Sequence, residues 1–332
     1  MFIALIAGGT KGHLRPAELL AAELEKKGHQ TLLIGKGIKK SYLQTSISYI
    51  EVPSSNQWKK LPFTLYGALQ SAYHLRRVDL VISFGSYHSV SAMLAVRWIL
   101  RRQYLLYEPN VSIGKAHRLF VKGALSICSP FSQPYKNAVC IHPLTGLKPA
   151  KKPPSSLLKV GDPLRILVFG GSQGAIWLNH FFLQAVEKLR LEKEVAIIHI
   201  LGKHMDRAWA FKRYQEMGVT AEVYEYVPSM DEIYSRVDVA VARAVAGTLF
   251  ELLSHEIPAV LIPYPYGEKH QKENAQFAHD LGCVEYFEQD SLTVERLISS
   301  IFQVVKKASF QKARRFLQQK RRSLIEIIED LS

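Results

Sequence analysis

Two stretches of the chain share one pattern of apolar and polar positions. Each starts with an apolar run, at 2–7 and at 165–169, passes into a turn of the form G-G-[S/T]-x-G, and continues as an amphipathic segment at 16–27 or 175–191. Such apolar runs are typical of parallel strands buried on both faces, and apolar residues three and four apart indicate helices. The sequence therefore predicts an α/β protein with two Rossmann-like domains, each opened by one of these strand–turn–helix segments.

The same alternation continues along both halves of the chain. Apolar runs predict further strands at 30–35, 79–84, 103–107, 195–201, 237–242 and 259–262. The segment 148–156 is rich in proline, lysine and serine, which is typical of a linker. We therefore expect an N-terminal domain over 1–148, a linker over 149–156 and a C-terminal domain over 157–314, followed by a basic helical tail within 302–331.

The composition is that of a globular protein with a large positive charge. The chain has 332 residues, 48% of them hydrophobic, with 43 basic and 29 acidic side chains and a formal net charge of +14. This length suits two domains, and the hydrophobic share is too high for a disordered chain. The charge leaves nucleic acid, an anionic membrane surface and a phosphorylated substrate open as partners, although a solvated basic surface without a partner is the simpler alternative.

The sequence also bears on where the protein works. Its three cysteines, Cys128, Cys140 and Cys283, form no CxxC pair, so we expect a reducing compartment. No apolar run approaches the roughly 18 residues of a membrane-spanning helix. The first run, 1–7, has no basic region before it and leads into glycines, so we interpret it as a strand and not as a signal peptide. The expected location is therefore the cytosol.

The second glycine-rich turn, Gly170–Gly174, has the features of a phosphate-binding loop. Glycines let the backbone approach a bound group closely, and the helix that follows points unpaired N–H groups at it. The turn lacks the Gly-Lys-[Ser/Thr] ending of a P-loop and the G-x-G-x-x-G spacing of dinucleotide-binding folds. Neither nucleotide hydrolysis nor a dinucleotide cofactor is therefore favoured, and a tight turn without a ligand remains the alternative.

Two titratable residues are predicted near the edge where α/β sheets bind ligands. His13 ends the first glycine-rich turn, where an imidazole could act as a general base or could merely cap the following helix. Glu251 falls about one turn into a predicted helix that follows Arg243. Its carboxylate could accept hydrogen bonds from a ribose diol, or could simply complement the helix dipole.

Further polar residues follow predicted strands or begin predicted helices. Glu108 and Asn110 come after one strand and Tyr87 after another, so these side chains should share an edge with His13 unless they only shape turns. His270, Gln271 and Asn274 begin a predicted helix and could hold sugar hydroxyls, or could form an ordinary polar helix surface. The sequence contains no Asp-x-Asp and no His/Cys cluster with zinc spacing, so we expect no metal ion.

Taken in order, these motifs resemble those of the family 28 glycosyltransferases of peptidoglycan synthesis over almost the whole chain. The most specific matches are the segments 8–13, 108–110, 170–179 and 243–274. The resemblance implies two Rossmann-like domains facing a cleft, the GT-B architecture, with a C-terminal helix of about 315–332 crossing back to the first domain. It also implies an inverting transfer of N-acetylglucosamine from UDP-N-acetylglucosamine to the C4 hydroxyl of lipid I, giving lipid II, without a metal ion or other cofactor.

The resemblance also assigns roles to the residues that match the family's motifs. The base would be His13, with Glu108 as a second catalytic residue. The acceptor would be bound in the N-terminal half, by Gly8, Gly9, Tyr87, Asn110 and Lys148. The donor would be bound mainly in the C-terminal half, by Thr10, Gly12, Ser172, Gln173, Gly174, Asn179, Tyr226, Val227, Arg243, Thr248, Glu251, His270, Gln271 and Asn274.

The matched motifs also depart from the family pattern in places. Lys11 stands where the family has glycine, Pro109 where it has glutamine, and Ala244 and Val245 where it has serine and glycine. The family's arginine near Lys148 is missing, and a lysine does not reproduce the two parallel hydrogen bonds of an arginine. The resemblance is therefore that of a divergent member.

A lipid-linked acceptor implies contact with a membrane. The segment 58–77 combines apolar and basic side chains, which suits an anionic membrane surface or an ordinary amphipathic helix. We expect a peripheral protein at the cytoplasmic face of the cell membrane, with no nucleic acid partner and with cell-wall and division proteins as candidate partners. Three alternatives stay open: another lipid-acceptor glycosyltransferase such as a diacylglycerol glucosyltransferase, a UDP-N-acetylglucosamine 2-epimerase, and a non-catalytic cell-wall scaffold.

Overall fold

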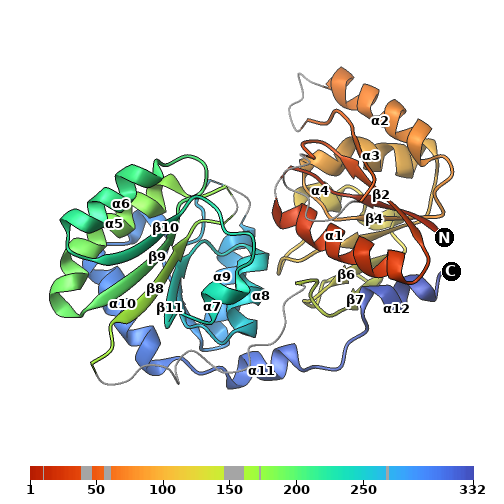
Figure 1. Ribbon diagram of the computed structural model, residues 1–332. Helices are drawn as coiled ribbons and strands as arrows, with labels where there is room; N and C mark the ends of the chain where they lie inside the picture. The colour runs from red at the N-terminus through yellow and green to blue at the C-terminus, as the bar shows by residue number, and fades with distance from the viewer. Residues whose placement is uncertain (10, 39–46, 56–60, 146–160, 172, 267–268) are drawn as a thin grey trace. The chain divides into compact units, whose positions relative to one another are not determined.

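The computed structural model describes residues 1–9, 11–38, 47–55, 61–145, 161–171, 173–266 and 269–332. The chain divides into two compact units, which are both drawn in Figure 1. Unit 1 comprises Met1–Gly146 and Lys320–Ser332, and unit 2 comprises Leu147–Gln319. The expected linker, 149–156, lies outside the described residues.

Unit 1 is built on a parallel sheet. Over the described ranges its seven strands follow the order β3-β2-β1-β4-β5-β6-β7. The strands are β1 (Phe2–Ile6), β2 (Gln30–Gly35), β3 (Tyr49–Glu51), β4 (Leu80–Ser83), β5 (Tyr104–Tyr107), β6 (Ser126–Ser129) and β7 (Ala138–Cys140). The helices are α1 (Lys11–Lys26), α2 (Leu61–Leu75), α3 (Val90–Leu94), α4 (Lys115–Arg118) and α12 (Leu324–Glu329).

Helices cover both faces of this sheet, which explains why its central strands are apolar throughout. One face packs against α1 through residues that include Leu14 and Leu20, and against α12 through Leu324 and Ile328. On the other face, α3 contributes Met93 to the core. Figure 1 shows α12 beside α1, so the chain returns to unit 1 to complete its core.

Unit 2 repeats the topology. In the part of it that the structure describes, six parallel strands follow the order β10-β9-β8-β11-β12-β13. The strands are β8 (Leu164–Phe169), β9 (Val195–Ile200), β10 (Thr220–Tyr224), β11 (Val239–Ala242), β12 (Ala259–Leu261) and β13 (Val284–Tyr286). The helices are α5 (Ile176–Glu192), α6 (Arg207–Glu216), α7 (Asp231–Tyr234), α8 (Ala246–Ser254), α9 (His270–Asp280), α10 (Val294–Lys307) and α11 (Gln311–Leu317). The strand order reverses between β8 and β11, as it does between β1 and β4, and open α/β sheets bind ligands at such points.

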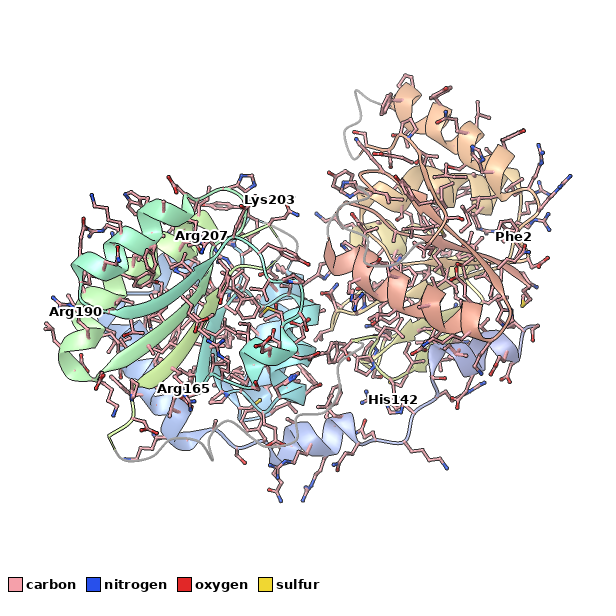
Figure 2. All side chains as sticks on the ribbon, in the orientation of Figure 1. Phe2, His142, Arg165, Arg190, Lys203 and Arg207 are labelled. Atoms are coloured by element: carbon pink, nitrogen blue, oxygen red, sulfur yellow. The ribbon has the colours of Figure 1, made fainter. Side chains whose placement is uncertain are left out.

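Equivalent aspartates occupy the amino-terminal edges of the two sheets. Asp79, just before β4, accepts a hydrogen bond of 2.7 Å from the backbone N–H of Phe2. Asp238, just before β11, accepts one of 2.9 Å from the backbone N–H of Arg165 and forms an ion pair of 2.6 Å with its guanidinium. In Figure 2, Arg165 marks this edge of unit 2, and Lys203, which follows β9, marks the carboxyl-terminal edge. The amino-terminal edges therefore hold stabilising contacts, and the carboxyl-terminal edges are left for the candidate site.

The first helix starts earlier than the sequence pattern predicts. The pattern places the start near Pro16, whereas α1 begins at Lys11 and runs through the proline. Proline fixes φ near the helical value, so the helix can continue through Pro16. Because proline has no N–H, the hydrogen bond that residue 16 would otherwise donate to the carbonyl of Gly12 is lost. His13 consequently lies inside the first turn of a helix and not in a loop.

The tail expected within 302–331 is helical, but it is divided into separate helices, and the helix that returns to unit 1 is shorter than the expected 315–332. The tail forms α10, α11 and α12, separated by non-helical residues. Ser323 begins α12 with a capping box: its side chain accepts from the backbone N–H of Glu326 at 3.1 Å, and the Glu326 carboxylate accepts from the backbone N–H of Ser323 at 2.7 Å. Such a cap requires Ser323 to be extended, and Arg322 pairs with Ile141 as in a parallel sheet, so the helix cannot continue through this point.

The described helices include none that is long and apolar enough to cross a membrane. Among the same residues, no three or more His, Cys, Asp and Glu side chains are grouped so that they could hold a metal ion.

Candidate functional site

The carboxyl-terminal end of β1 runs into a tight glycine turn. Gly9 has a left-handed φ of 81°, and its backbone N–H donates to the carbonyl of Lys36 at 2.9 Å. A Cβ at Gly9 would lie 2.2 Å from the ring of His88, and one at Gly8 would lie 2.3 Å from the Lys36 carbonyl oxygen. Both positions need glycine, because any larger residue would push the turn away from these neighbours.

His13 is held in one orientation. Its Nδ1 lies 2.9 Å from the backbone carbonyl oxygen of Phe84, the residue that follows β4. Because a carbonyl can only accept, Nδ1 carries a proton and donates it, and in the neutral ring this leaves the lone pair on Nε2. A fixed tautomer with a basic Nε2 is the form that a general base requires.

A second histidine, His88, lies beside this turn. Burial, and then electrostatic interaction with His13 and Lys36, lower the pKa of His88 to about 4. Its Nδ1 is 2.8 Å from the hydroxyl of Ser86, and the centroid of its ring is 3.8 Å from that of Tyr87, which is 40% exposed. His88 is therefore neutral at neutral pH, and it adds no positive charge to the turn.

Glu108, after β5, is buried and fully occupied by hydrogen bonds. Its Oε1 accepts from the backbone N–H and the side-chain amide of Asn110, at 3.2 and 2.8 Å. Its Oε2 accepts from the backbone N–H of Gly114 at 3.0 Å and from Nδ1 of His117 at 3.1 Å. Burial raises the pKa of Glu108, but the hydrogen bonds from His117, Gly114 and Asn110 outweigh it and bring the pKa below its usual value. This carboxylate braces the loop, and we expect it to orient Asn110 and not to accept a proton from a substrate.

The glycine-rich turn after β8 is equally tight. Gly174 has a φ of 79°, and a Cβ there would lie 2.2 Å from the carbonyl oxygen of Leu201 in the loop after β9. Helix α5 begins directly after this turn, at Ile176. Unpaired backbone N–H groups of a first helical turn, next to a glycine-rich turn, are suited to binding an anion.

Asn179 supports this turn from behind. It is completely buried, its Nδ2 donates to the Leu201 carbonyl at 2.9 Å, and its Oδ1 is 3.2 Å from Nε2 of His199. The other ring nitrogen of His199 is 2.8 Å from the hydroxyl of Tyr214, and burial lowers the pKa of His199 to about 3. In this structure Asn179 therefore offers no atom to a ligand, and it acts by holding the loops after β8 and β9 together.

Arg243, after β11, is a buried cation that organises a loop. Its guanidinium donates to the carbonyls of Ile262 and Pro263 at 3.0 and 3.1 Å and to the amide oxygen of Gln289 at 2.7 Å. It also lies 5.6 Å from the centroid of the Tyr264 ring. Burial lowers the pKa of Arg243 to about 10, so the side chain stays protonated at neutral pH.

The loop that Arg243 holds continues to Gln271. The side-chain oxygen of Gln271 accepts from the backbone N–H of Tyr264 at 3.0 Å. Asn274, one turn further along α9, is completely buried and donates to the carbonyl of Ala244 at 3.1 Å. Like Asn179, Asn274 supports the backbone and has no exposed atom.

Glu251 lies in α8 and is half-buried. Its Oε2 accepts a hydrogen bond of 2.5 Å from the hydroxyl of Tyr234. Burial and then the Glu251 carboxylate raise the pKa of Tyr234 well above its usual value, so this hydroxyl remains a donor. Thr248, in the first turn of the same helix, is 5% exposed.

The remaining predicted residues lie at the carboxyl-terminal edges. Tyr226 is exposed, and Val227, Gln173 and His270 are half-buried. Gly12 is exposed in the first turn of α1. Thr10, Ser172 and Lys148, as well as the side chain of Lys11, lie outside the described residues.

Three residues of these edges were not predicted. His88 follows Tyr87 directly, so it could have been found in the same way as Tyr87, as a polar residue just after a predicted strand. His117 and Gln289 have no such signal, because each gains its importance from a partner distant in sequence, Glu108 for the first and Arg243 for the second.

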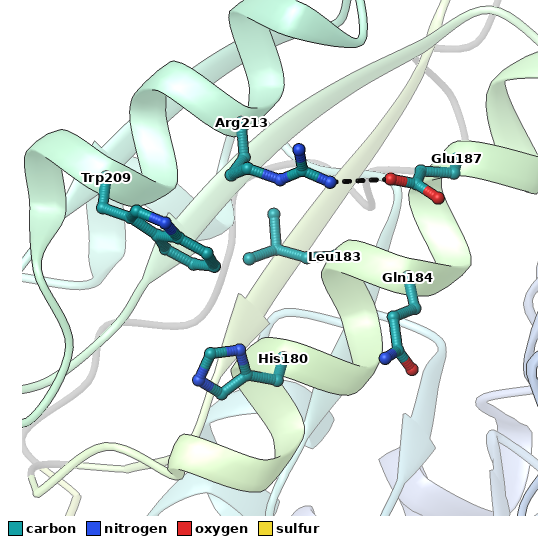
Figure 3. Close-up of a pocket in the computed structure, with 6 residues that line it drawn as sticks. All are labelled: His180, Leu183, Gln184, Glu187, Trp209 and Arg213. Carbon is teal, nitrogen blue, oxygen red and sulfur yellow. Dashed lines mark hydrogen bonds and ion pairs between the residues drawn. The ribbon is translucent and has the colours of Figure 1, made fainter.

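A shallow groove lies elsewhere on unit 2, between α5 and α6 (Figure 3). His180, Leu183, Gln184 and Glu187 of α5 and Trp209 and Arg213 of α6 line it. Arg213 and Glu187 form an ion pair of 2.9 Å across it. None of the predicted site residues lines this groove, so it is separate from the candidate site.

Both units match descriptions of known families. The Glycosyltransferase family 28 N-terminal domain matches residues 3–129, and the Glycosyltransferase family 28 C-terminal domain matches residues 165–328. These ranges contain the carboxyl-terminal edges of both sheets.

Curated relatives match over most of the chain. A UDP-N-acetylglucosamine--N-acetylmuramyl-(pentapeptide) pyrophosphoryl-undecaprenol N-acetylglucosamine transferase from Chlamydia trachomatis serovar L2 is 30% identical over 94% of this chain and 92% of its own length. An enzyme of the same name from Hydrogenovibrio crunogenus is 29% identical, with 89% and 86% of the two chains covered. Among solved structures, the crystal structure of Acinetobacter baumannii MurG is similar in fold, with a TM-score of 0.77, 24% identity, and coverage of 99% of this chain and 98% of that one.

Proposed function

This chain belongs to glycosyltransferase family 28, and on that premise we propose that it transfers N-acetylglucosamine from UDP-N-acetylglucosamine to lipid I, forming lipid II. The observation that carries the proposal is the 30% identity to the Chlamydia trachomatis transferase over 94% of the chain. That similarity spans the two units, so it includes the parts proposed to bind the donor and those proposed to bind the acceptor.

The proposed base is His13. Its Nδ1 is committed to the Phe84 carbonyl, which leaves Nε2 to take the proton from the C4 hydroxyl of the acceptor sugar. The oxygen then forms a bond to the anomeric carbon, and the bond from that carbon to UDP breaks on the opposite face, giving a β-linked product. General-base assistance of this kind typically contributes about 10²–10⁴-fold to the rate.

The proposed donor site uses the carboxyl-terminal edge of unit 2. Backbone N–H groups of the Gly170–Gly174 turn and of the start of α5 would stabilise the departing diphosphate, since such donors are fixed before charge develops. Glu251, with Tyr234 donating to one of its oxygens, would accept from the ribose hydroxyls. Gln271 would contact the sugar, and Arg243 would hold the loop that positions it.

The test uses purified protein, UDP-[¹⁴C]N-acetylglucosamine and a lipid I analogue in detergent, with EDTA present. We expect a labelled disaccharide lipid, formed without added metal. Saturable binding of UDP-N-acetylglucosamine without transfer would contradict the proposed acceptor and favour another lipid. Absence of donor binding would contradict the enzyme assignment and favour the scaffold.

We also propose that α2 contacts an anionic membrane, at the cytoplasmic face where the acceptor would be presented. The usual distribution of side chains is inverted in this helix. Apart from Leu75 at its end, its buried residues are small: Thr64, Gly67, Ala68 and Ser71. Its large apolar side chains are mostly exposed: Leu61, Phe63, Leu65, Tyr66, Leu69 and Tyr73. A Cβ at Gly67 would lie 1.9 Å from the carbonyl oxygen of Pro53, so the small face is closely packed. Exposed apolar side chains with flanking Arg76 and Arg77 are typical of an interfacial helix.

The membrane proposal is tested by sedimentation with vesicles of phosphatidylglycerol and of phosphatidylcholine. We expect binding to the anionic vesicles that weakens with salt, and we expect Leu65→Glu/Leu69→Glu to abolish it. Leu191→Glu, at an even more exposed leucine in unit 2, is the control and should bind as the wild type does. Equal binding of both variants would contradict the proposal.

A further inference from the structure

A buried chain of hydrogen bonds links the ends of β4 and β5 in unit 1. The hydroxyl oxygen of Ser83, the last residue of β4, lies 3.2 Å from Nε2 of His117. The Nδ1 of His117 lies 3.1 Å from Oε2 of Glu108, the residue after β5. The three residues are 0%, 1% and 3% exposed.

Glu108 fixes the position of one proton in this chain of hydrogen bonds. Glu108 is ionised and can only accept, so Nδ1 of His117 donates to it. The other nitrogen of the ring, Nε2, is hydrogen-bonded to the hydroxyl of Ser83. The Ser83 oxygen in turn is 3.4 Å from the backbone N–H of Gly85, which donates to it.

A serine, a histidine and a carboxylate linked in this order also form the catalytic triad of many hydrolases. The burial of Ser83, however, argues against hydrolytic activity here. A nucleophile must reach a substrate, and Ser83 has no exposed surface. The Glu108 carboxylate also accepts hydrogen bonds from Asn110 and Gly114, so it serves the loop after β5 as well as the histidine. The chain is therefore a structural connection.

The connection joins the two loops that carry the proposed acceptor site. At one end, Ser83 precedes Phe84, whose carbonyl fixes the tautomer of His13. The ring of His117 also lies against the turn, because a Cβ at Gly85 would be 3.1 Å from its Cε1. At the other end, Glu108 holds both the backbone and the side chain of Asn110.

We infer that His117 is a positioning residue that fixes, from one buried ring, the orientation of His13 and that of Asn110. The inference rests on the proposed function, in which His13 is the base and Asn110 contacts the acceptor. His117 itself touches neither substrate. Its removal should therefore lower kcat and raise the acceptor KM while leaving the affinity for UDP-N-acetylglucosamine unchanged.

Three variants separate the two ends of the connection. His117→Ala removes both, and we expect kcat to fall roughly 10- to 100-fold, because small displacements of a catalytic group are costly. His117→Asn places an amide donor near the position of Nδ1, so it keeps the bond to Glu108 and should restore the acceptor KM to within about threefold of wild type. Ser83→Ala cuts only the other end and should lower kcat with little change in the acceptor KM.

A destabilised control distinguishes positioning from general loss of stability. Ile127→Val removes one methylene group from the core of unit 1 and leaves every hydrogen-bonding group of the connection in place. It should leave kcat and both KM values unchanged. If His117→Ala behaves like Ile127→Val, or if His117→Asn restores nothing, the inference is wrong.

A spectroscopic measurement tests the inference without using activity. In ¹⁵N-detected imidazole spectra, with His13 assigned from the His13→Ala variant, the wild type should show Nδ1 protonated. His117→Ala should show a mixture of the two tautomers, and Ile127→Val should match the wild type. An unchanged His13 tautomer in His117→Ala overturns the inference. Failure of the wild type to transfer sugar would overturn the proposed function and leave this measurement intact.

Discussion

The carboxyl-terminal edges of the two units share a topology and differ in chemistry. Each follows a strand order that reverses beside its first strand, and each begins with a glycine turn and a long helix. In unit 1 the edge holds imidazoles and a carboxylate: His13 lies close enough to His88 to lower its pKa, and His117 is hydrogen-bonded to Glu108. In unit 2 the corresponding edge holds backbone donors, amides and Arg243. Under the proposed function, the edge of unit 1 would serve proton transfer, and the edge of unit 2 would hold an anion and hydroxyl groups.

This difference teaches that the topology supplies a position and the side chains supply the role. The amino-terminal edges, where Asp79 and Asp238 make the same backbone contact, show what the two units keep in common. Substitutions that change one edge at a time therefore test the two roles separately.

The largest expected effect is on proton transfer. His13→Ala should lower kcat by about 10²–10⁴-fold, since the general base is lost, and should leave the Kd for UDP-N-acetylglucosamine unchanged. The measurement is steady-state kinetics with a lipid I analogue, together with calorimetric binding of the donor.

His29→Ala is the matched control for that variant, because its ring is partly buried in the same unit and contacts the N-terminal amine. It should transfer at the wild-type rate. Transfer at the wild-type rate by His13→Ala would show that the base lies elsewhere.

Acid should weaken unit 2 through His199. Its pKa is about 3 in the folded protein, below the ordinary value of 6.5, so between these values the unfolded chain binds a proton that the folded one does not. Stability is therefore fully present above pH 6.5 and is lost as the pH falls toward 3, by about 5 kcal/mol in total if the group responds fully.

The acid effect is measured by urea unfolding at several pH values. The fluorescence of Trp177 and Trp209 reports on unit 2 when Trp58 and Trp98 are replaced by phenylalanine. His199→Gln should flatten the pH dependence, whereas His279→Gln, a half-buried histidine of the same unit, should not. An unchanged slope in His199→Gln would contradict the assignment.

The two aspartates should differ in their contribution to stability. Asp238→Ala leaves Arg165 without its ion pair and should cost about 3 kcal/mol, whereas Asp79→Ala loses one hydrogen bond and should cost about 1 kcal/mol. Urea unfolding of the two variants checks this order. Equal costs would mean that the ion pair contributes nothing beyond the shared backbone contact.

The smallest expected effect concerns the loop that Arg243 holds. Arg243→Lys cannot reach the Ile262 and Pro263 carbonyls and Gln289 together, so the donor KM should rise about tenfold with the acceptor KM unchanged. The control is Arg207→Lys, because the guanidinium of Arg207 also donates to a carbonyl in unit 2. This variant should change neither the donor KM nor the acceptor KM. A change confined to the acceptor KM would reverse the assignment of the two edges.

Much of the fold could be predicted from the sequence, because the central strands are buried on both faces and so appear as apolar runs. Five strands, β3, β6, β7, β10 and β13, were not predicted. Three of them, β3, β7 and β13, have three residues each and include partly or fully exposed positions. The other two, β6 and β10, mix polar with apolar residues and so form no apolar run. The break before α12 depends on the cap at Ser323, which a basic helical pattern conceals.

The candidate site divides in a similar way. Motif spacing led to His13 and Arg243, because polar residues after strands meet at one edge. It could not separate residues that face a ligand from those that support a loop, and the structure buries Asn179 and Asn274 completely. It also missed His117, since nothing in the local sequence shows that this ring reaches Ser83 and Glu108.

The return of the chain to unit 1 has a consequence for synthesis on the ribosome. Leu324 and Ile328 of α12 complete the hydrophobic core beside α1, yet they are made after all of unit 2. The nascent unit 1 must therefore wait with an uncovered apolar surface, whereas all of unit 2 has been made before α12 emerges. Unit 1 is therefore synthesised first but can complete its core only after unit 2 has been made. A chaperone would protect the exposed apolar surface of unit 1 during this time.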